Sequence, residues 1–324
     1  MRAPKFWQNK DSKLARFLNP LGRIYSFFVM RRLRQNNPYQ ANMPVICVGN
    51  LSVGGVGKTP VCLALGNYLR QKEKKFYFLN HGYKARQQSV LVDVHTHSAV
   101  DVGDEALLLA LTAPTIVDSA RARGAQLAER LKADLLLMDD GFQNPSLVKT
   151  LSLVVVDGSL GFGNERVLPA GPLREPVLTG LKRADALILV GKDTWGVKNY
   201  LKQKGVDLPV LKGKFVQDES VLETLKNKSV GAFAGIGHPD KFFKMLTQNG
   251  IQLKTTKYFP DHYFYTRFDI EEMKKENPDL VWATTTKDWV KIPTEVRMNI
   301  VAITGHFEFD NPEKLDQLMK EVLS

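Results

Sequence analysis

The chain has 324 residues, of which 44% are hydrophobic and 24% are charged, proportions that are typical of a soluble globular protein. This length is sufficient for two domains with separate cores. No stretch approaches the roughly 20 apolar residues that a membrane span requires, and the N-terminus shows no secretory signal. The two cysteines, Cys47 and Cys62, lack metal-ligand spacing and fit small core residues in a reducing compartment.

The net charge of +11 is concentrated in residues 1–41, which carry nine Lys or Arg and one acid, Asp11. Apolar residues recur there at helical spacing, and Asn19 with Pro20 indicates the start of a second helix. A basic amphipathic arm of this kind predicts contact with an anionic membrane surface. The alternative is a helical pair packed on the body with solvated charges. The apolar positions are Leu14, Phe17, Leu18, Leu21, Ile24, Tyr25 and Phe28.

A glycine-rich segment that follows the apolar run Val45–Val48 predicts a phosphate-binding loop. Glycines allow consecutive backbone N–H groups to surround phosphate oxygens, and the following helix directs its positive end toward them. Lys58 supplies a charge, and Thr59 supplies an oxygen for Mg²⁺. The usual pattern has glycine at the position of Ser52, and an ordinary glycine-rich turn is the alternative. The residues predicted to bind nucleotide are Ser52, Val53, Gly54, Gly55, Val56, Gly57, Lys58 and Thr59.

Apolar runs alternate with helical stretches between residues 42 and 190, which predicts a mostly parallel sheet flanked by helices, as in P-loop NTPases. The polar stretch 191–214 is expected to be a linker. Residues 215–324 are expected to form a second, smaller α/β domain. The expected strands of the first domain are Val45–Val48, Phe76–Leu79, Thr115–Val117, Leu135–Met138, Leu153–Val156 and Ala186–Val190, and its helices include Pro60–Gln71, Glu105–Leu111 and Ser119–Ala133.

Three further groups of residues could carry chemistry. An apolar strand that ends in Asp139 and Asp140 has the pattern of a Walker B acid, and which of the two lies nearer the metal stays open. Asp104 and Glu105 precede a Leu-rich helix, where they serve either catalysis or simple capping. His262 follows Asp261 in a predicted loop, where such a pair is more often part of a turn than of a proton relay.

Together these segments resemble the tetraacyldisaccharide 4′-kinase family of lipid A biosynthesis. The resemblance extends from the basic arm to the C-terminal domain, and the set of motifs in this order is specific. The motifs are Gly49-Asn50-Leu51-Ser52-Val53-Gly54-Gly55-Val56-Gly57-Lys58-Thr59-Pro60, Gly103-Asp104-Glu105, Asp139-Asp140-Gly141-Phe142-Gln143, Leu168-Pro169-Ala170-Gly171-Pro172-Leu173-Arg174-Glu175 and Phe259-Pro260-Asp261-His262.

The resemblance implies transfer of the γ-phosphoryl group of ATP, with Mg²⁺, to the 4′-hydroxyl of an acylated glucosamine disaccharide 1-phosphate. It also implies a peripheral location at the cytoplasmic face of the bacterial inner membrane. Asp104 resembles the family's base and His262 its partner, which places the pair across an interdomain cleft. The implied sets are Asp104, His262, Lys58 and Arg174 for catalysis, Thr59, Glu105 and Asp139 for the metal, and Tyr83, Arg121, Gln143 and Glu175 for the substrate.

Two positions depart from the family pattern: His81 stands where the family commonly has Arg, and Asn144 stands where it commonly has His. The rival classes are a P-loop ATPase of the partition or septum-site type and a nucleic-acid-binding kinase. The first usually has a lysine at the position of Val53. The second requires a basic body, whereas the basic surplus here is confined to the arm. We therefore expect a lipid substrate and no nucleic-acid partner.

Overall fold

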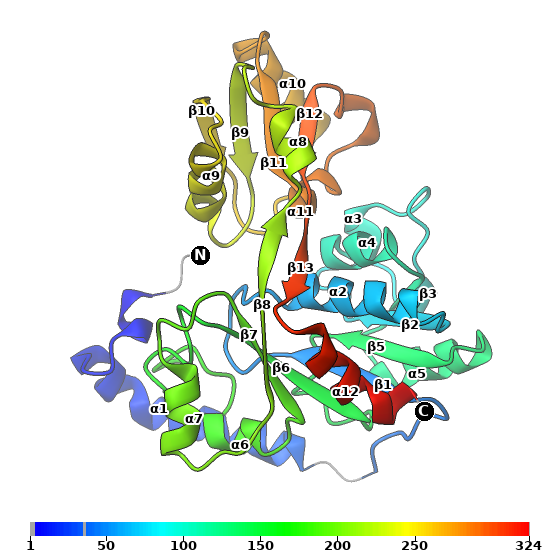
Figure 1. The fold of residues 1–324 in the computed structure, drawn as a ribbon, viewed down its shortest axis with the longest axis vertical. Helices are drawn as coiled ribbons and strands as arrows, with labels where there is room; N and C mark the ends of the chain where they lie inside the picture. Colours follow the sequence, from blue (N-terminus) through cyan, green and yellow to red (C-terminus); the bar gives the residue numbers. More distant parts are fainter. Residues whose placement is uncertain (1–3, 35–36, 324) are drawn as a thin grey trace.

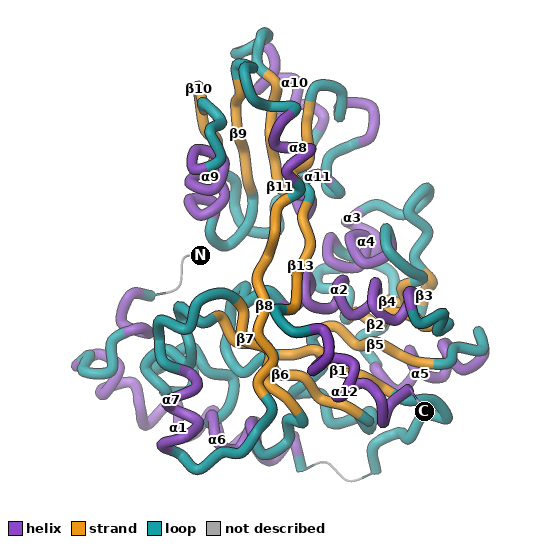
Figure 2. The backbone as a smooth tube through the Cα atoms, in the orientation of Figure 1, coloured by secondary structure: helices purple, strands orange, loops and turns teal. Residues whose placement is uncertain are grey.

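The structure, a computed structural model, describes residues 4–34 and 37–323, so Arg2 of the expected arm lies outside the described residues. The chain forms two α/β units of unequal size, the larger below the smaller in Figure 1. Two antiparallel strands of the larger sheet, β8 (Val210–Gln217) and β13 (Gly305–Phe309), rise between the units as a neck (Figure 2).

The larger sheet contains nine strands within the described ranges, in the order β13-β8-β7-β6-β1-β5-β2-β4-β3. Pairing is parallel from β8 to β4 and antiparallel at both edges. The carboxyl ends of β1, β5 and β2 therefore meet at one edge of the sheet. The remaining strands are β1 Val45–Gly49, β2 Phe76–Asn80, β3 Val90–Leu91, β4 Thr115–Val117, β5 Leu135–Asp139, β6 Leu151–Asp157 and β7 Ala186–Val190.

Helices cover both faces of this sheet, which explains why nearly every position of its central strands is buried. One face packs against α2 (Lys58–Gln71), α4 (Asp104–Ala110) and α12 (Pro312–Leu323). The other face packs against α5 (Arg121–Arg130), α6 (Val177–Leu181) and α7 (Val197–Gln203). A short helix, α3 (Ala99–Val102), precedes α4. The predicted parallel sheet is confirmed, and helix boundaries differ from expectation by at most three residues.

The smaller unit has a parallel sheet in the order β10-β9-β11-β12 among the described residues. One face packs on α8 and α9, and the other packs on α10 and the 3₁₀ helix η2 around Trp282. The elements are α8 Glu219–Glu223, β9 Val230–Ala234, α9 Pro239–Gln248, β10 Leu253–Tyr258, α10 Arg267–Glu276, β11 Val281–Thr285, α11 Thr286–Trp289, η2 Thr294–Val296 and β12 Ile300–Ile303.

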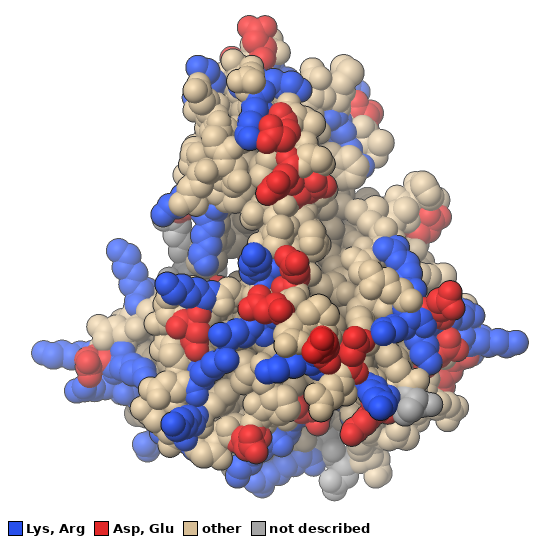
Figure 3. Space-filling model, viewed as in Figure 1, with Lys and Arg blue, Asp and Glu red and all other residues tan. Residues whose placement is uncertain are grey.

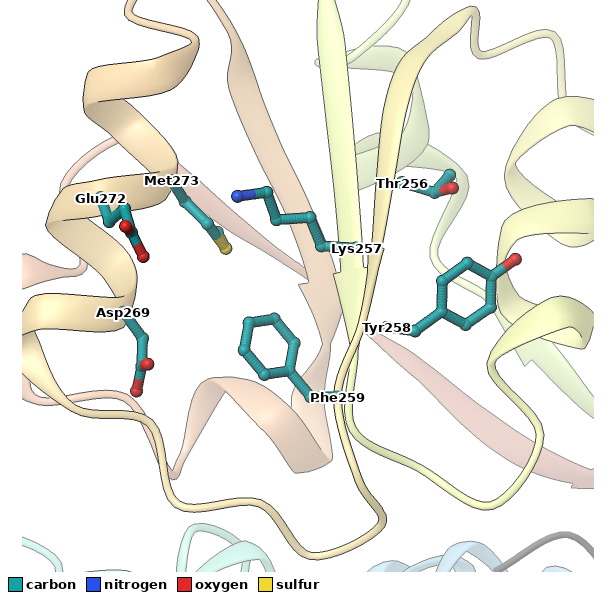
Figure 4. Close-up of a pocket in the computed structure, with 7 residues that line it drawn as sticks. All are labelled: Thr256, Lys257, Tyr258, Phe259, Asp269, Glu272 and Met273. Atoms are coloured by element: carbon teal, nitrogen blue, oxygen red, sulfur yellow. The ribbon is translucent and has the colours of Figure 1, made fainter.

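A pocket lies between β10 and α10 of the smaller unit (Figure 4). Lys257 of β10 and Phe259, directly after the strand, point into it, whereas Thr256 and Tyr258 point to the other side. None of the described residues that line it belongs to the predicted nucleotide, metal or substrate sets. The predicted site residues lie elsewhere in the structure.

The expected linker, residues 191–214, is instead a structured part of the larger unit. It contains α7 and most of β8, and β8 pairs with β7. Only alternate residues at the start of β8, such as Leu211, are buried, so its sequence appears polar. Residues 305–323 also return to the larger sheet as β13 and α12, which the boundary at residue 215 did not foresee.

The N-terminal arm begins with a 3₁₀ turn, η1 (Lys5–Gln8), and continues as one helix, α1 (Lys13–Leu33), with Pro20 inside it. The expected second start at Asn19 is therefore wrong. A proline inside a helix removes one hydrogen bond of the ladder, yet α1 continues through Pro20. The buried residues of α1 are Ala15 and Gly22. No helix in the described part of the chain has the length and apolarity that crossing a membrane would need.

Candidate active site

The phosphate-binding loop lies between β1 and the start of α2. Gly54 and Gly57 have φ angles of 110° and 92°, in the left-handed region that side chains disfavour. Gly57 is the N-cap of α2, so the positive end of this 14-residue helix faces the loop. Lys58 Nζ lies 3.4 Å from Asn50 Oδ1 and 3.5 Å from Asp140 Oδ2.

The first part of the loop is tied to a segment more than 100 residues away. Ser52 forms an antiparallel bridge with Leu173, and the Val53 N–H donates to the Pro172 carbonyl at 2.8 Å. The N–H of Val53, one of the residues predicted to bind nucleotide, is therefore occupied within the protein. The stretch from Gly54 to Thr59 is the part left to face a nucleotide.

Asp139 is fully buried at the end of β5, next to Thr59. Its Oδ2 accepts from Thr59 Oγ1 at 3.2 Å and from Asn80 Nδ2 at 3.4 Å, while its Oδ1 has no hydrogen-bond partner among the described residues. Burial, and then the negative charge of Glu105, raise the pKa of Asp139 to about 7. An unpartnered carboxylate oxygen beside a hydroxyl suits a hard divalent cation.

The described residues contain no cluster of three His, Cys, Asp or Glu that would hold a metal without other ligands. Proteins usually bind Mg²⁺ through one or two carboxylates together with substrate phosphates. Thr59 and Asp139 fit that role, and Glu105 is near enough for its charge to act on Asp139. Of the two aspartates after β5, it is Asp139 that contacts the loop threonine.

Asp140 instead forms ion pairs with the predicted catalytic cations. Arg174 Nη1 and Nη2 lie 3.0 and 3.3 Å from its two oxygens, and Lys58 approaches from the loop. Burial acts to raise the pKa of Asp140, but the charges of Lys58 and Arg174 outweigh it and lower the pKa. The residue has a φ of 52°, a backbone conformation that is uncommon outside glycine and recurs at functional sites.

Three of the residues predicted to bind substrate form the support behind this ion pair. Gln143 donates to the Asn50 carbonyl and to Glu175, and Glu175 is fully buried against Arg183. Arg121 is also buried and donates to the carbonyls of Asp118, Asp139 and Asp140. The structure thus places Arg121 and Glu175 inside the protein, where their hydrogen bonds hold the loops.

Asp104 and His262, which are 158 residues apart, meet between the two units. His262 Nδ1 lies 2.9 and 3.1 Å from the two oxygens of Asp104, a carboxylate with 4% of its surface exposed. Burial acts to raise the pKa of Asp104, but the His262 hydrogen bond and the Lys287 charge lower it to about 2. Tyr83 is exposed beside this pair, with its ring centroid 5.1 Å from that of His262.

Simple capping does not account for Asp104. The N-cap of α4 is Gly103, which makes no side-chain cap, and Asp104 is the first residue of the helix. Its Oδ1 accepts from the Glu105 N–H at 3.0 Å, but both of its oxygens also contact His262. A carboxylate used only as a cap would be satisfied by the helix itself.

Sequence reasoning missed Lys287 and Asn80. Lys287 Nζ lies 3.4 Å from both Glu105 Oε1 and His262 Nε2. A lysine in the first turn of a helix normally has a solvated side chain, so no local pattern pointed to this one. The two residues that depart from the family pattern have different surroundings. His81 is exposed, whereas Asn144 Oδ1 accepts from the N–H and the hydroxyl of Ser146, which closes a local turn.

These contacts define a class of protein, the P-loop phosphotransferases, in which a nucleotide cradle faces a separate group that can accept a proton. The family model described as tetraacyldisaccharide-1-P 4′-kinase matches residues 14–324. Tetraacyldisaccharide 4′-kinase of Paramagnetospirillum magneticum is 45% identical over 99% of this chain and 99% of its own length. The relative of that name from Rhodospirillum centenum is 41% identical over 100% of this chain and 97% of its own.

Among solved structures, the "apo" form of LpxK from Aquifex aeolicus in complex with ATP superposes with a TM-score of 0.78 at 30% identity, and it covers 96% of this chain and 100% of its own. The chain therefore belongs to the tetraacyldisaccharide-1-P 4′-kinase family. The resemblance deduced from the five motifs is confirmed, and the partition-type and nucleic-acid alternatives are not favoured.

The raised pKa of Asp139 makes stability depend on pH in a direction opposite to that of a salt-bridged aspartate. In the unfolded chain this carboxyl ionises near pH 3.9, whereas in the folded protein its pKa is about 7. Between about pH 4 and 7 the folded state binds more protons than the unfolded state. The free energy of unfolding contributed by this group therefore falls as pH rises through that window.

We expect Asp139→Asn, which cannot ionise, to remove this loss. Without Mg²⁺ or nucleotide, the variant should match wild type near pH 4 and exceed its free energy of unfolding by about 1–4 kcal/mol at pH 8, as measured by urea unfolding. Asp207→Asn, at an exposed acid, is the control and should follow wild type throughout. Parallel curves for Asp139→Asn and wild type from pH 4 to 8 would contradict the assignment.

Proposed function

We propose that this protein transfers the γ-phosphoryl group of ATP to the 4′-hydroxyl of a tetraacylated glucosamine disaccharide 1-phosphate. The relatives' names describe a 4′-kinase acting on a tetraacyldisaccharide. The observation that carries the proposal is the contact between Asp104 and His262, a pair suited to accept a proton, between the two units. The next residue, Glu105, is near enough for its charge to raise the pKa of Asp139, the carboxylate proposed to bind the metal.

The nucleotide side of the site supplies positioning and charge. The stretch from Gly54 to Thr59 and the N-terminus of α2 would hold the β- and γ-phosphates, and Lys58 would neutralise their charge. Thr59, Asp139 and Glu105 would hold Mg²⁺, which when bound offsets charge on the transferring group. Arg174 lies beside Lys58 through their shared partner Asp140, so both cations are placed at the same loop.

The acceptor side provides the base. Because the pKa of Asp104 is about 2, its carboxylate is ionised at neutral pH and available to take the proton of the sugar hydroxyl. The hydroxyl oxygen forms the new bond to the γ-phosphorus while the bond to the β-phosphate bridging oxygen breaks, and ADP leaves with that electron pair. His262 donates through Nδ1 to Asp104 and fixes the orientation of its carboxylate.

The reaction itself can be tested with the purified protein. With ATP, Mg²⁺ and detergent-dispersed tetraacyldisaccharide 1-phosphate, we expect a product that carries one additional phosphate, as measured by mass spectrometry. Lys58→Ala should lower kcat by on the order of 100-fold or more, because one preorganised electrostatic contact is lost. DNA and RNA offered in place of the lipid should remain unphosphorylated. Phosphorylation of nucleic acid and not of the lipid would overturn the proposal.

The role of the Asp104–His262 pair gives a separate prediction. Asp104→Asn keeps the shape but cannot take a proton, so kcat should fall by about 100-fold or more while the KM for ATP changes little. His262→Ala should lower kcat similarly, and the double variant should lose little more than either single one. Losses that multiply in the double variant would show that the two residues act independently.

We propose further that α1 binds an anionic membrane surface, at the cytoplasmic face of the bacterial inner membrane. The helix packs on the body through Ala15 and Gly22, while Phe17, Phe27 and Phe28 are 80%, 62% and 63% exposed. This is the reverse of a helix whose apolar face is covered by the protein. Figure 3 shows Lys and Arg side chains at the lower left, where Figure 1 places both α1 and α7.

The exposed face of α1 combines large apolar side chains with cations, as interfacial helices do. Replacing Arg31, Arg32 and Arg34 with Gln should weaken binding to anionic vesicles by about 1 kcal/mol per charge near the surface. Vesicle sedimentation at low and high salt measures this, and the weakening should be smaller at high salt.

A matched control separates a local effect from one of net charge. The triple replacement Lys228→Gln, Lys244→Gln and Lys254→Gln removes the same charge from exposed positions of the smaller unit and should leave vesicle binding nearly unchanged. Equal weakening by both triple variants would contradict a binding surface on α1.

A further inference from the structure

Lys287 is the one side chain of α11 that reaches the predicted catalytic groups of both units. Its ammonium lies 3.4 Å from Nε2 of His262, 3.4 Å from Oε1 of Glu105 and 3.8 Å from Oδ2 of Asp104. Glu105 and Asp104 belong to α4 of the larger unit, whereas Lys287 and His262 belong to the smaller unit. Lys287 therefore bridges the two units at the point where the proton-accepting pair forms.

These contacts select one arrangement of the His262 ring. An ammonium group only donates hydrogen bonds, so Nε2 must be the acceptor when it pairs with Lys287. The proton of the neutral ring then lies on Nδ1, where it is donated to Asp104. The two partners of His262, on opposite sides of the ring, require the same tautomer.

A buried network of hydrogen bonds and one ion pair connects the helix that carries Lys287 with the loop that carries His262. The carboxylate of Asp288, which is buried, accepts from the Gly235 N–H at 3.1 Å and pairs with Lys291 at 2.8 Å. The carbonyl of Gly235 in turn accepts from the backbone N–H of His262 at 3.3 Å. The start of α11 and the loop that carries His262 are therefore fixed by the same buried group.

The contact between α11 and α4 continues beyond the charged groups. Val290, directly after α11, is buried in an apolar cluster with Ala106 and Leu107 of α4, and Trp289 packs against the same cluster. Apolar packing thus holds the two helices together, while the ammonium aligns the polar groups at their ends. Without Lys287, the adjacent acids Asp104 and Glu105 would face the smaller unit with no cation from α11 to balance their charge.

We propose that Lys287 is a positioning residue for phosphoryl transfer: from the smaller unit it holds His262 through Nε2 and anchors α11 to the acids of α4, so that the Asp104–His262 pair is aligned. This inference rests on the proposed function and extends it to a residue outside the motifs. Lys287 acts through His262 and Asp104 and does not itself accept the proton.

The first test is Lys287→Met, which keeps the side-chain length and removes the ammonium. We expect kcat with the lipid acceptor to fall by about 10- to 100-fold, the usual effect of losing a residue that orients a catalytic group, while the KM for ATP changes less than threefold. Lys254→Met, at an exposed lysine of the same unit, is the matched control and should retain wild-type kcat. A variant kcat within threefold of wild type would overturn the inference.

Chemical rescue separates positioning from a general loss of structure. Cys47 and Cys62 are both buried, so in folded Lys287→Cys the thiol at position 287 is the accessible one for alkylation. Treatment with 2-bromoethylamine, with a single adduct confirmed by mass spectrometry, restores an ammonium at lysine length and should recover at least tenfold in kcat. Iodoacetamide, which gives a neutral adduct, should not. Equal recovery, or none, with both singly modified proteins would contradict the role of the charge.

A double variant distinguishes action through His262 from an independent effect on the nucleotide. If Lys287 acts through His262, Lys287→Met should add less than threefold to the loss caused by His262→Ala. Multiplying losses, or a KM for ATP raised tenfold, would place Lys287 in nucleotide or metal binding and overturn the inference. Wild-type turnover in the same assay isolates the proposed function: an inactive wild type refutes that function, whereas an active wild type with an equally active Lys287→Met refutes only this inference.

Discussion

The contact between the Asp104 carboxylate and His262 is the interaction on which the rest of the site depends. Neither residue is useful alone: Asp104 sits at the start of α4 in the larger unit, and His262 sits on a loop of the smaller one. A buried carboxylate is costly unless it is paired, so the hydrogen bond and the nearby ammonium of Lys287 are what keep Asp104 ionised. The contact between the two units therefore offsets the cost of burying this carboxylate.

The parallel sheet explains how the other groups come together. The carboxyl ends of β1, β5 and β2 lie side by side and deliver the glycine loop, Asp139 and Asn80 to one edge. Asp139 and Asp140 are adjacent in sequence but have opposite pKa directions, because one is fully buried near Glu105 and the other is paired with Lys58 and Arg174. The environment thus gives two identical side chains opposite tendencies to ionise.

A second continuous path connects the arm with the nucleotide loop. Trp7 donates to the Pro169 carbonyl, and the Asn164 N–H donates to the Trp7 carbonyl, so the start of the arm is held by residues 164–169. A few residues later, the same segment pairs with the nucleotide loop at Ser52 and Val53. The helix with the exposed aromatic face and the phosphate-binding loop therefore share one supporting segment.

The sequence by itself determined the fold class, the nucleotide loop and the family, because these depend on local patterns: apolar runs, glycine spacing and motifs in a fixed order. It also named Asp104 and His262 as partners, although only through the resemblance. It misjudged β8, whose alternate residues at the start of the strand are exposed, so that its pattern resembles a polar linker. It also misjudged α1, because a proline usually ends a helix, whereas this helix continues through Pro20.

Only the tertiary structure could show which polar side chains are buried, since burial depends on contacts between distant segments. It placed Arg121 and Glu175 inside the protein as supports, and it brought Lys287 from an unremarked helix to the acids of α4. It also left Oδ1 of Asp139 without a partner among the described residues. The sequence determines which side chains can ionise or form hydrogen bonds. The fold determines the pKa values of those side chains and the partners that they contact.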